Sequence, residues 1–91
     1  METFRSEKND RFYFKNYQDI DEELIIQEAK TKLEKFPHIK FYGYQEIIYL
    51  DIWEGTFHDM EFRLCNDINY GSFLICNDEH VLKEIEDILN N

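Results

Sequence analysis

The 91-residue chain has little of what marks several common classes of protein. It holds only three glycines and one proline, and the glycines form neither a GxGxxG motif nor a P-loop. No GxSxG or HExxH motif is present, and the three histidines and two cysteines do not show the short spacing of metal ligands. We therefore expect no enzymatic activity, no cofactor and no metal site.

Long hydrophobic runs are also missing. No apolar stretch reaches the roughly 20 residues that a membrane-spanning helix requires, and no signal peptide is recognisable. The polar residues 1–10 predict a flexible or edge segment, and residues 11–91 predict a single domain. The sequence therefore predicts a cytoplasmic protein, in which Cys65 and Cys76 are reduced, buried thiols.

Basic residues are scarce in the second half of the chain. The formal net charge is −10, and residues 41–91, with eleven acidic and two basic residues, account for −9 of it. Such a field repels nucleic-acid phosphates and anionic lipids and attracts basic proteins. The alternative is that the acidic surface only keeps the protein soluble.

Two segments have the apolar period of amphipathic helices. The first runs from Asp19 to Phe36, where Asp19 and Glu22 fit a capping box, and it ends before the single proline. The second follows a cap at Asn77 or Asp78. Each carries a stripe of residues that we expect to be buried: Ile26, Ala29, Leu33 and Phe36 in the first, and Val81, Leu82, Ile85, Ile88 and Leu89 in the second.

The other apolar segments are rich in β-branched and aromatic residues and predict strands. They are Arg11–Tyr17, Ile39–Trp53, Phe57–Cys65 and Ser72–Cys76. We expect a bend or bulge at Gly43, a turn at Glu54–Thr56 and a polar loop at Asn66–Gly71. The order is β-α-β-β-β-α, which predicts an α+β fold: an antiparallel sheet of three or four strands with two helices on one face.

Residues 19–90, in the predicted order α-β-β-β-α, resemble the layout of the double-stranded-RNA-binding domain. That family presents lysines to phosphates near the start of its second helix. The matching stretch here, Asp78–Asp87, is acidic. The resemblance therefore implies a related topology and no direct binding of nucleic acid.

Alternation along the strands predicts which face of the sheet the helices cover. The even-numbered residues are apolar and are expected under the helices: Ile48, Leu50, Ile52, Met60, Phe62, Leu64, Leu74 and Cys76. A three-residue turn at Glu54–Thr56 supports this face, because it pairs Leu50 with Met60, whereas a two-residue turn pairs Leu50 with Asp59. In this register Asp51 and Asp59 lie opposite each other.

The odd-numbered face is left open and mixes aromatic rings with carboxylates. Such a surface is typical of protein interfaces, where rings supply buried area and carboxylates complement a basic partner. We predict a partner-binding site of six residues: Tyr49, Asp51, Trp53, Phe57, Asp59 and Glu61. The alternative is that these are ordinary sheet residues, or that the N-terminal segment covers them.

These features predict a small acidic binding protein that inhibits or neutralises a basic partner, such as a nuclease, a toxin or a nucleic-acid-binding complex. In size and charge the chain is similar to toxin-immunity proteins, uracil-glycosylase inhibitors and phage-borne anti-restriction or anti-CRISPR proteins. The carboxylates would then take the place of DNA phosphates. The alternatives are a homodimeric, self-assembling module and a small enzyme or metal-binding protein.

Overall fold

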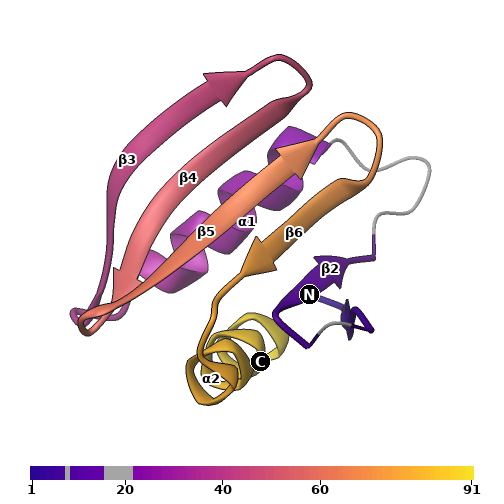
Figure 1. Ribbon diagram of the computed structural model, residues 1–91. Helices are drawn as coiled ribbons and strands as arrows, with labels where there is room; N and C mark the ends of the chain where they lie inside the picture. The colour runs from indigo at the N-terminus through magenta and orange to yellow at the C-terminus, as the bar shows by residue number, and fades with distance from the viewer. Residues whose placement is uncertain (8, 16–21) are drawn as a thin grey trace.

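The computed structural model describes residues 1–7, 9–15 and 22–91, which form six strands and two helices (Figure 1). The strands are β1 (Thr3–Arg5), β2 (Arg11–Phe14), β3 (Ile39–Ile47), β4 (Leu50–Phe57), β5 (Met60–Asp67) and β6 (Gly71–Ile75), and the helices are α1 (Glu22–Glu34) and α2 (Glu79–Asn90). The strands pair antiparallel in one sheet of order β1-β2-β6-β5-β4-β3. The predicted α+β class is confirmed.

The predicted count of three or four strands is wrong for two reasons. The segment Ile39–Trp53 is not one strand, because the chain reverses at Ile48–Tyr49 between β3 and β4. The short strand β1 also adds an edge beside β2. The reversal was hidden in the sequence because Ile48 and Tyr49 are not turn-forming residues. The bulge predicted at Gly43 is present as a register shift between Phe41 and Gly43.

Both helices follow their apolar patterns. Asp78 caps α2 as predicted, since its Oδ1 accepts a hydrogen bond from the Val81 amide at 3.0 Å. Phe36 is an exception, because α1 ends at Glu34 and leaves the Phe36 ring exposed against His38. The predicted cap Asp19 lies outside the described residues. Neither helix of the described part is long and apolar enough to cross a membrane.

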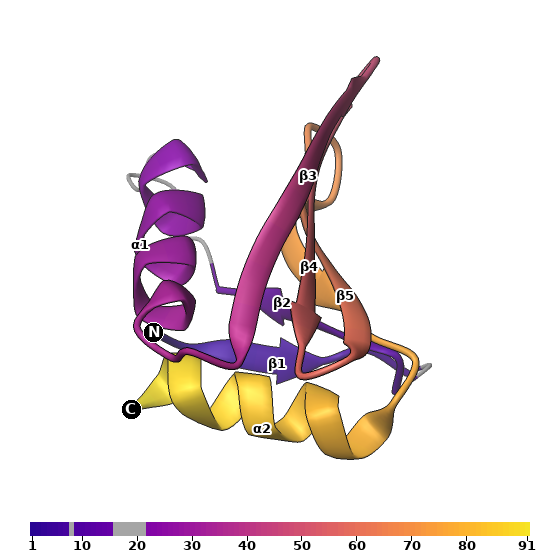
Figure 2. The same cartoon turned by 90° about the vertical axis from the view of Figure 1, so that its left-hand side faces the viewer.

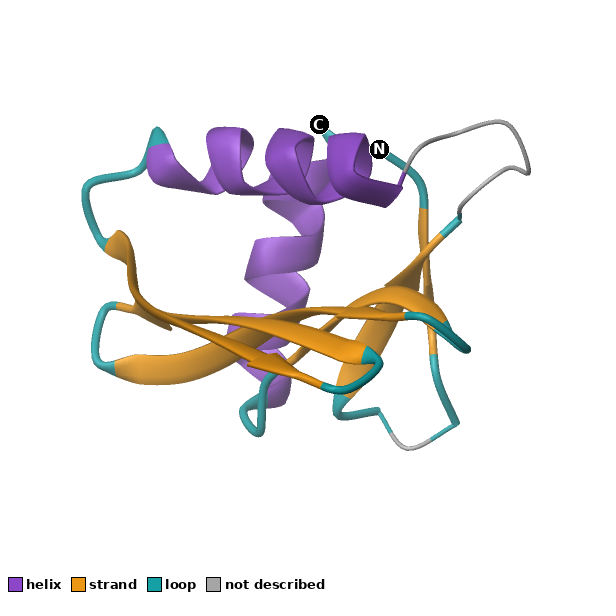
Figure 3. Ribbon diagram, turned by 90° about the horizontal axis from the view of Figure 1, so that it is seen from above, coloured by secondary structure: helices purple, strands orange, loops and turns teal. Residues whose placement is uncertain are grey.

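The main core lies between the helices and one face of the twisted sheet. α1 lies along that face, and α2 runs across the lower end of the sheet, crosswise to α1 (Figures 2 and 3). Both helices contribute fully buried leucines, such as Leu33 and Leu82. From the sheet come Phe12, Phe14, Ile39, Phe57, Phe62, Leu64, Leu74 and Cys76. Two helices on one face were predicted; α1 covers the face, whereas α2 closes the end of the sheet.

The N-terminal segment, predicted to be flexible or an edge, contains β1 and contacts α2. The amino group of Met1 donates to the Leu89 carbonyl at 3.2 Å. Thr3 Oγ1 and Arg5 Nε donate to the Glu86 carboxylate at 2.6 and 2.9 Å. The first and last elements of the chain are therefore joined directly.

The turn between β4 and β5 lies at His58–Asp59, so the predicted turn at Glu54–Thr56 is wrong. Phe57 pairs with Met60 across it, while Glu54–Thr56 continue β4. His58 has a left-handed backbone (φ 54°), a conformation that histidine adopts more readily than most residues. The turn is thus made without glycine.

Gly55 lies inside β4 for a reason unrelated to turns. A Cβ at this position would lie 2.6 Å from Cζ of Phe62 and 2.9 Å from the carbonyl oxygen of Lys40. Without a side chain at Gly55, the Phe62 ring packs directly against the backbone and is 2% exposed. The glycine therefore marks a close approach in the core.

In the observed register, the side chains of β4 lie on the faces of the sheet opposite to those predicted. Trp53 pairs with Leu64 and faces the main core, whereas Ile52 pairs with Cys65 on the opposite face. Leu50 and Ile52, predicted under the helices, therefore lie on the open face. A shift of one residue in register moves every side chain of a strand to the other face.

We expect Gly55→Ala to lower the free energy of unfolding by about 2 kcal/mol or more, because Phe62 must move out of its packed position. The matched control is Gly43→Ala, where the nearest atom to a new Cβ is Glu54 Cβ at 3.7 Å. That variant should stay within about 1 kcal/mol of the parent. Urea denaturation measures both, and equal effects of the two substitutions would contradict the packing role of Gly55.

Candidate functional site

One end of the sheet carries a group of exposed apolar side chains. It is formed by the β3–β4 turn and the β5–β6 loop, which lie together at the top of Figure 1. We call Ile47, Ile48, Tyr49 and Ile68 the apolar tip; they are 52, 79, 67 and 66% exposed. The Ile68 amide donates to the Tyr49 carbonyl at 2.9 Å, which joins the two loops. The apolar tip is therefore one continuous surface.

The two loops are held in defined conformations. Tyr49 has a left-handed backbone (φ 72°), which is unusual for a bulky residue and costs roughly 1–2 kcal/mol. In the other loop, Oδ1 of Asp67 accepts hydrogen bonds from the amides of Asn69 and Tyr70 at 2.7 and 3.1 Å. The chain thus keeps a large exposed ring at Tyr49 at an energetic cost.

A cleft of about 320 Å³ lies beside the apolar tip, between α1 and the β3–β4 hairpin. These two elements diverge toward the tip in Figure 2. We call this space the hairpin cleft; its lining residues are Glu23, Ile26, Gln27, Lys30, Tyr44, Asp51, Trp53 and Asn66. A shallower hollow shares Glu23, Asp51 and Asn66 with it and is bordered by the apolar tip and Glu46. The tip and the cleft therefore form one connected site.

Aromatic rings and carboxylates alternate along the hairpin at this site. Tyr44 lies opposite Trp53, with ring centroids 5.1 Å apart and planes inclined by 41°. The Tyr44 hydroxyl donates to Oδ1 of Asp51 at 3.0 Å, and this hydrogen bond raises the pKa of Tyr44. Glu46 pairs directly with Asp51, so two carboxylates stand side by side on the strands.

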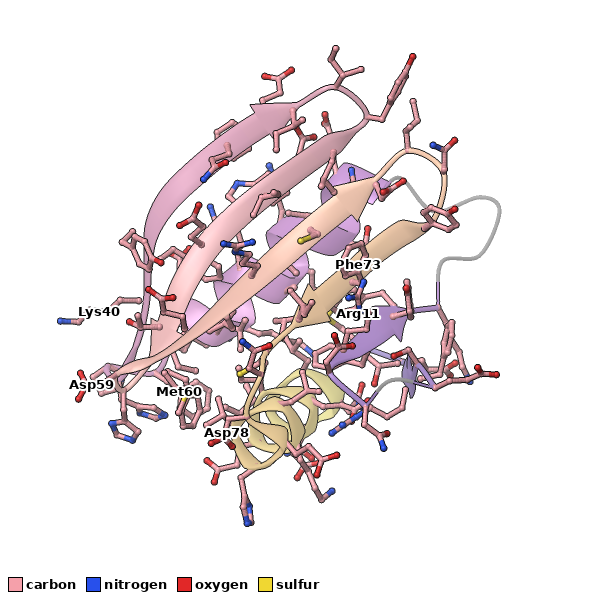
Figure 4. The ribbon with its side chains drawn as sticks, viewed as in Figure 1. Arg11, Lys40, Asp59, Met60, Phe73 and Asp78 are labelled. Carbon is pink, nitrogen blue, oxygen red and sulfur yellow. The ribbon has the colours of Figure 1, made fainter. Side chains whose placement is uncertain are left out.

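The structure divides the six predicted site residues between different places. Tyr49 is in the apolar tip, and Asp51 and Trp53 line the hairpin cleft. The remaining three, Phe57, Asp59 and Glu61, lie elsewhere: Phe57 is buried in the main core, Asp59 is in the turn at the lower left of Figure 4, and Glu61 is on the open face. The prediction of a single odd-numbered face is therefore wrong.

The predicted pairing of Asp51 with Asp59 is also wrong. Asp51 pairs with Asn66 of β5, whereas Asp59 lies in the β4–β5 turn, at the other end of β4. The cause is the turn position, which moves the whole register of β4 against β5. The carboxylate that lies opposite Asp51 is Glu46 of β3, the strand on the other side of β4. Glu46 was not predicted as a site residue.

The open face of the sheet is largely occupied by its own contacts. Ile52, Cys65 and Phe73 form a small buried cluster there, and burial raises the pKa of the Cys65 thiol to about 11. The Arg11 guanidinium lies 5.3 Å from the Phe73 ring centroid (Figure 4). Glu61 accepts a hydrogen bond from the Tyr42 hydroxyl at 3.3 Å. This face is therefore a weaker candidate for partner binding than the tip and cleft.

Sequence reasoning missed Tyr44, Glu46, Ile48 and Ile68. A turn at Ile48–Tyr49 is the signal that identifies the first two. With the turn there, Tyr44 falls opposite Trp53 and Glu46 falls opposite Asp51. Among the described residues, no group of three or more histidine, cysteine, aspartate or glutamate side chains is placed to hold a metal ion. No protein-family model, curated protein or solved structure matches the chain.

We expect Tyr49→Asn to raise the free energy of unfolding by about 0.5–1 kcal/mol, because asparagine tolerates the left-handed backbone better than tyrosine. The control is Ile48→Asn, at the neighbouring and more exposed position, where no positive φ is relieved. Urea denaturation compares the two variants. A loss of stability in Tyr49→Asn would show that the ring stabilises the fold and is not kept for binding.

Proposed function

We propose that this protein is a small acidic binding protein that inhibits a basic partner, such as a nuclease, a toxin or a nucleic-acid-binding complex. The apolar tip and the hairpin cleft form the docking surface, and no enzymatic activity is involved. The proposal keeps the function expected from the sequence and moves its site from the sheet face to the end of the sheet.

The exposed apolar tip is the observation that carries the proposal. Its side chains are more than half exposed, and they project from two loops that a backbone hydrogen bond joins. Apolar side chains gathered in one exposed place mark sites of protein interaction, and aromatic anchors such as Tyr49 often supply much of the binding energy. The left-handed backbone of Tyr49 supports this interpretation, because strained residues cluster at functional sites.

The charge around the tip supports a basic partner. Glu23, Glu46 and Asp51 border the hollow beside the apolar tip, and the part of the chain from residue 41 onward has a net charge of −9. A negative rim around an apolar centre speeds association with a basic surface and excludes acidic ones. It also disfavours docking of two copies through this site, because their carboxylates would repel each other.

The test is affinity capture of partners from host lysate, followed by an activity assay of the retained protein. We expect the parent chain to retain a basic protein in a salt-dependent way and to inhibit it. The double variant Ile48→Ser with Tyr49→Asn should weaken this binding by about tenfold or more, as expected when interface anchors are lost. The control is Met60→Ser, an exposed apolar residue at the start of β5, at the end of the sheet opposite the apolar tip.

Three results would contradict the proposal. One is equal retention by the parent and the tip variant. Another is retention of a partner whose activity is unchanged. The third is a chain that retains nothing and instead shows a mass that rises with concentration, which would favour the homodimeric module.

A further inference from the structure

The hairpin cleft is lined by two inclined aromatic rings, Tyr44 and Trp53, of which Trp53 is partly buried. Trp53 packs against the main core and is half-buried, while Tyr44 is 52% exposed and lies across from it. Their centroids are 5.1 Å apart at an angle of 41°. Proteins hold organic cations against the faces of tryptophan and tyrosine, which carry negative electrostatic potential.

Carboxylates surround these rings on both sides of the cleft. Glu23 of α1 and Asp51 of β4 line the cleft, and Glu46, which borders the adjoining hollow, pairs with Asp51 across β3 and β4. Like charges directly opposite each other in a sheet reduce stability. A cation bound between them would offset this repulsion, so the arrangement favours a positively charged occupant.

Lys30 is the basic residue among those that line the cleft. Its ammonium lies 5.4 Å from the centroid of the Phe41 ring, which is not part of the lining. The Lys30 ammonium thus lies over a ring outside the lining, and Tyr44, Trp53 and Asp51 are the lining groups whose chemistry suits a cationic ligand.

From this arrangement we infer that the hairpin cleft binds the guanidinium group of an arginine side chain. The source of that arginine is the basic partner, so the inference rests on the proposed function for its biological meaning. A guanidinium is planar: it stacks on an indole ring and donates two parallel hydrogen bonds to a carboxylate. At about 320 Å³ the cleft is at the small end of ligand sites, as suits one side chain.

Trp53 gives a direct readout, because it is the single tryptophan of the chain and lines the cleft. We would titrate the full chain with N-acetyl-arginine amide and follow tryptophan fluorescence. We expect a saturable change with a dissociation constant on the order of 1 mM, in the weak range of affinities. N-acetyl-citrulline amide, which has a nearly identical shape without the charge, should give no saturable change.

Two variants test the carboxylates, one in the cleft and one beside it. Asp51→Asn should weaken binding of the arginine amide by about tenfold, because a charged hydrogen-bond acceptor is lost. Glu46→Gln should also weaken binding. Because Glu46 is exposed on the edge strand β3, this variant remains a valid test even if Asp51→Asn does not fold. The matched control is Glu61→Gln, which removes an equal charge beside a tyrosine hydroxyl on the open face and should leave the affinity unchanged.

The outcomes separate this inference from the proposed function. Absence of a saturable change, an equal response to the citrulline amide, or equal effects of Asp51→Asn, Glu46→Gln and Glu61→Gln would overturn the arginine site. Partner capture that depends on the apolar tip would still support the proposed function in that case. Saturable binding of the arginine amide without any captured partner would support the cleft site and count against the proposed function.

Discussion

The packing of Phe62 against the backbone at Gly55 is the contact on which the arrangement of this protein depends. The ring occupies the space that a side chain of residue 55 would fill, and it thereby fixes β4 against β5. This register places Trp53 and Asp51 on the side of the helices. Had the strands paired with the opposite alternation, these residues would lie on the open face, and no cleft with aromatic and acidic lining would exist beside α1.

The parts of the fold that sequence predicted well are those governed by local chemistry. The second helix could be placed from its apolar period and from Asp78, whose carboxylate caps it. The strand pairing could not be placed in this way. The reversals at Ile48–Tyr49 and His58–Asp59 lack the usual turn residues, while Gly55, which has the appearance of a turn residue, is required inside a strand.

The candidate site was predicted only in part for the same reason: local sequence shows which residues are unusual, but strand pairing decides which of them lie together. Aromatic and acidic residues of the hairpin were recognised as unusual, and Tyr49, Asp51 and Trp53 do lie together at one end. The predicted site also includes Phe57 and Glu61, because the prediction extends the alternation across a turn at Glu54–Thr56, whereas the chain turns at His58–Asp59. Residues from other elements, such as Ile68, are joined to the site only by tertiary structure, through the hydrogen bond of its amide to Tyr49.

The contact between the first residues and α2 also constrains how the chain can fold. β2 pairs with β6, and β1 is attached to Glu86 of α2, so the earliest residues depend on the last ones. During synthesis, the N-terminal strands emerge long before these partners leave the ribosome. Completion of the sheet therefore requires closure of a long loop, because β2 must wait for β6 and β1 for α2, and this slows folding. The termini lie together away from the apolar tip (Figure 2), so a fused domain or tag at either terminus leaves the tip accessible.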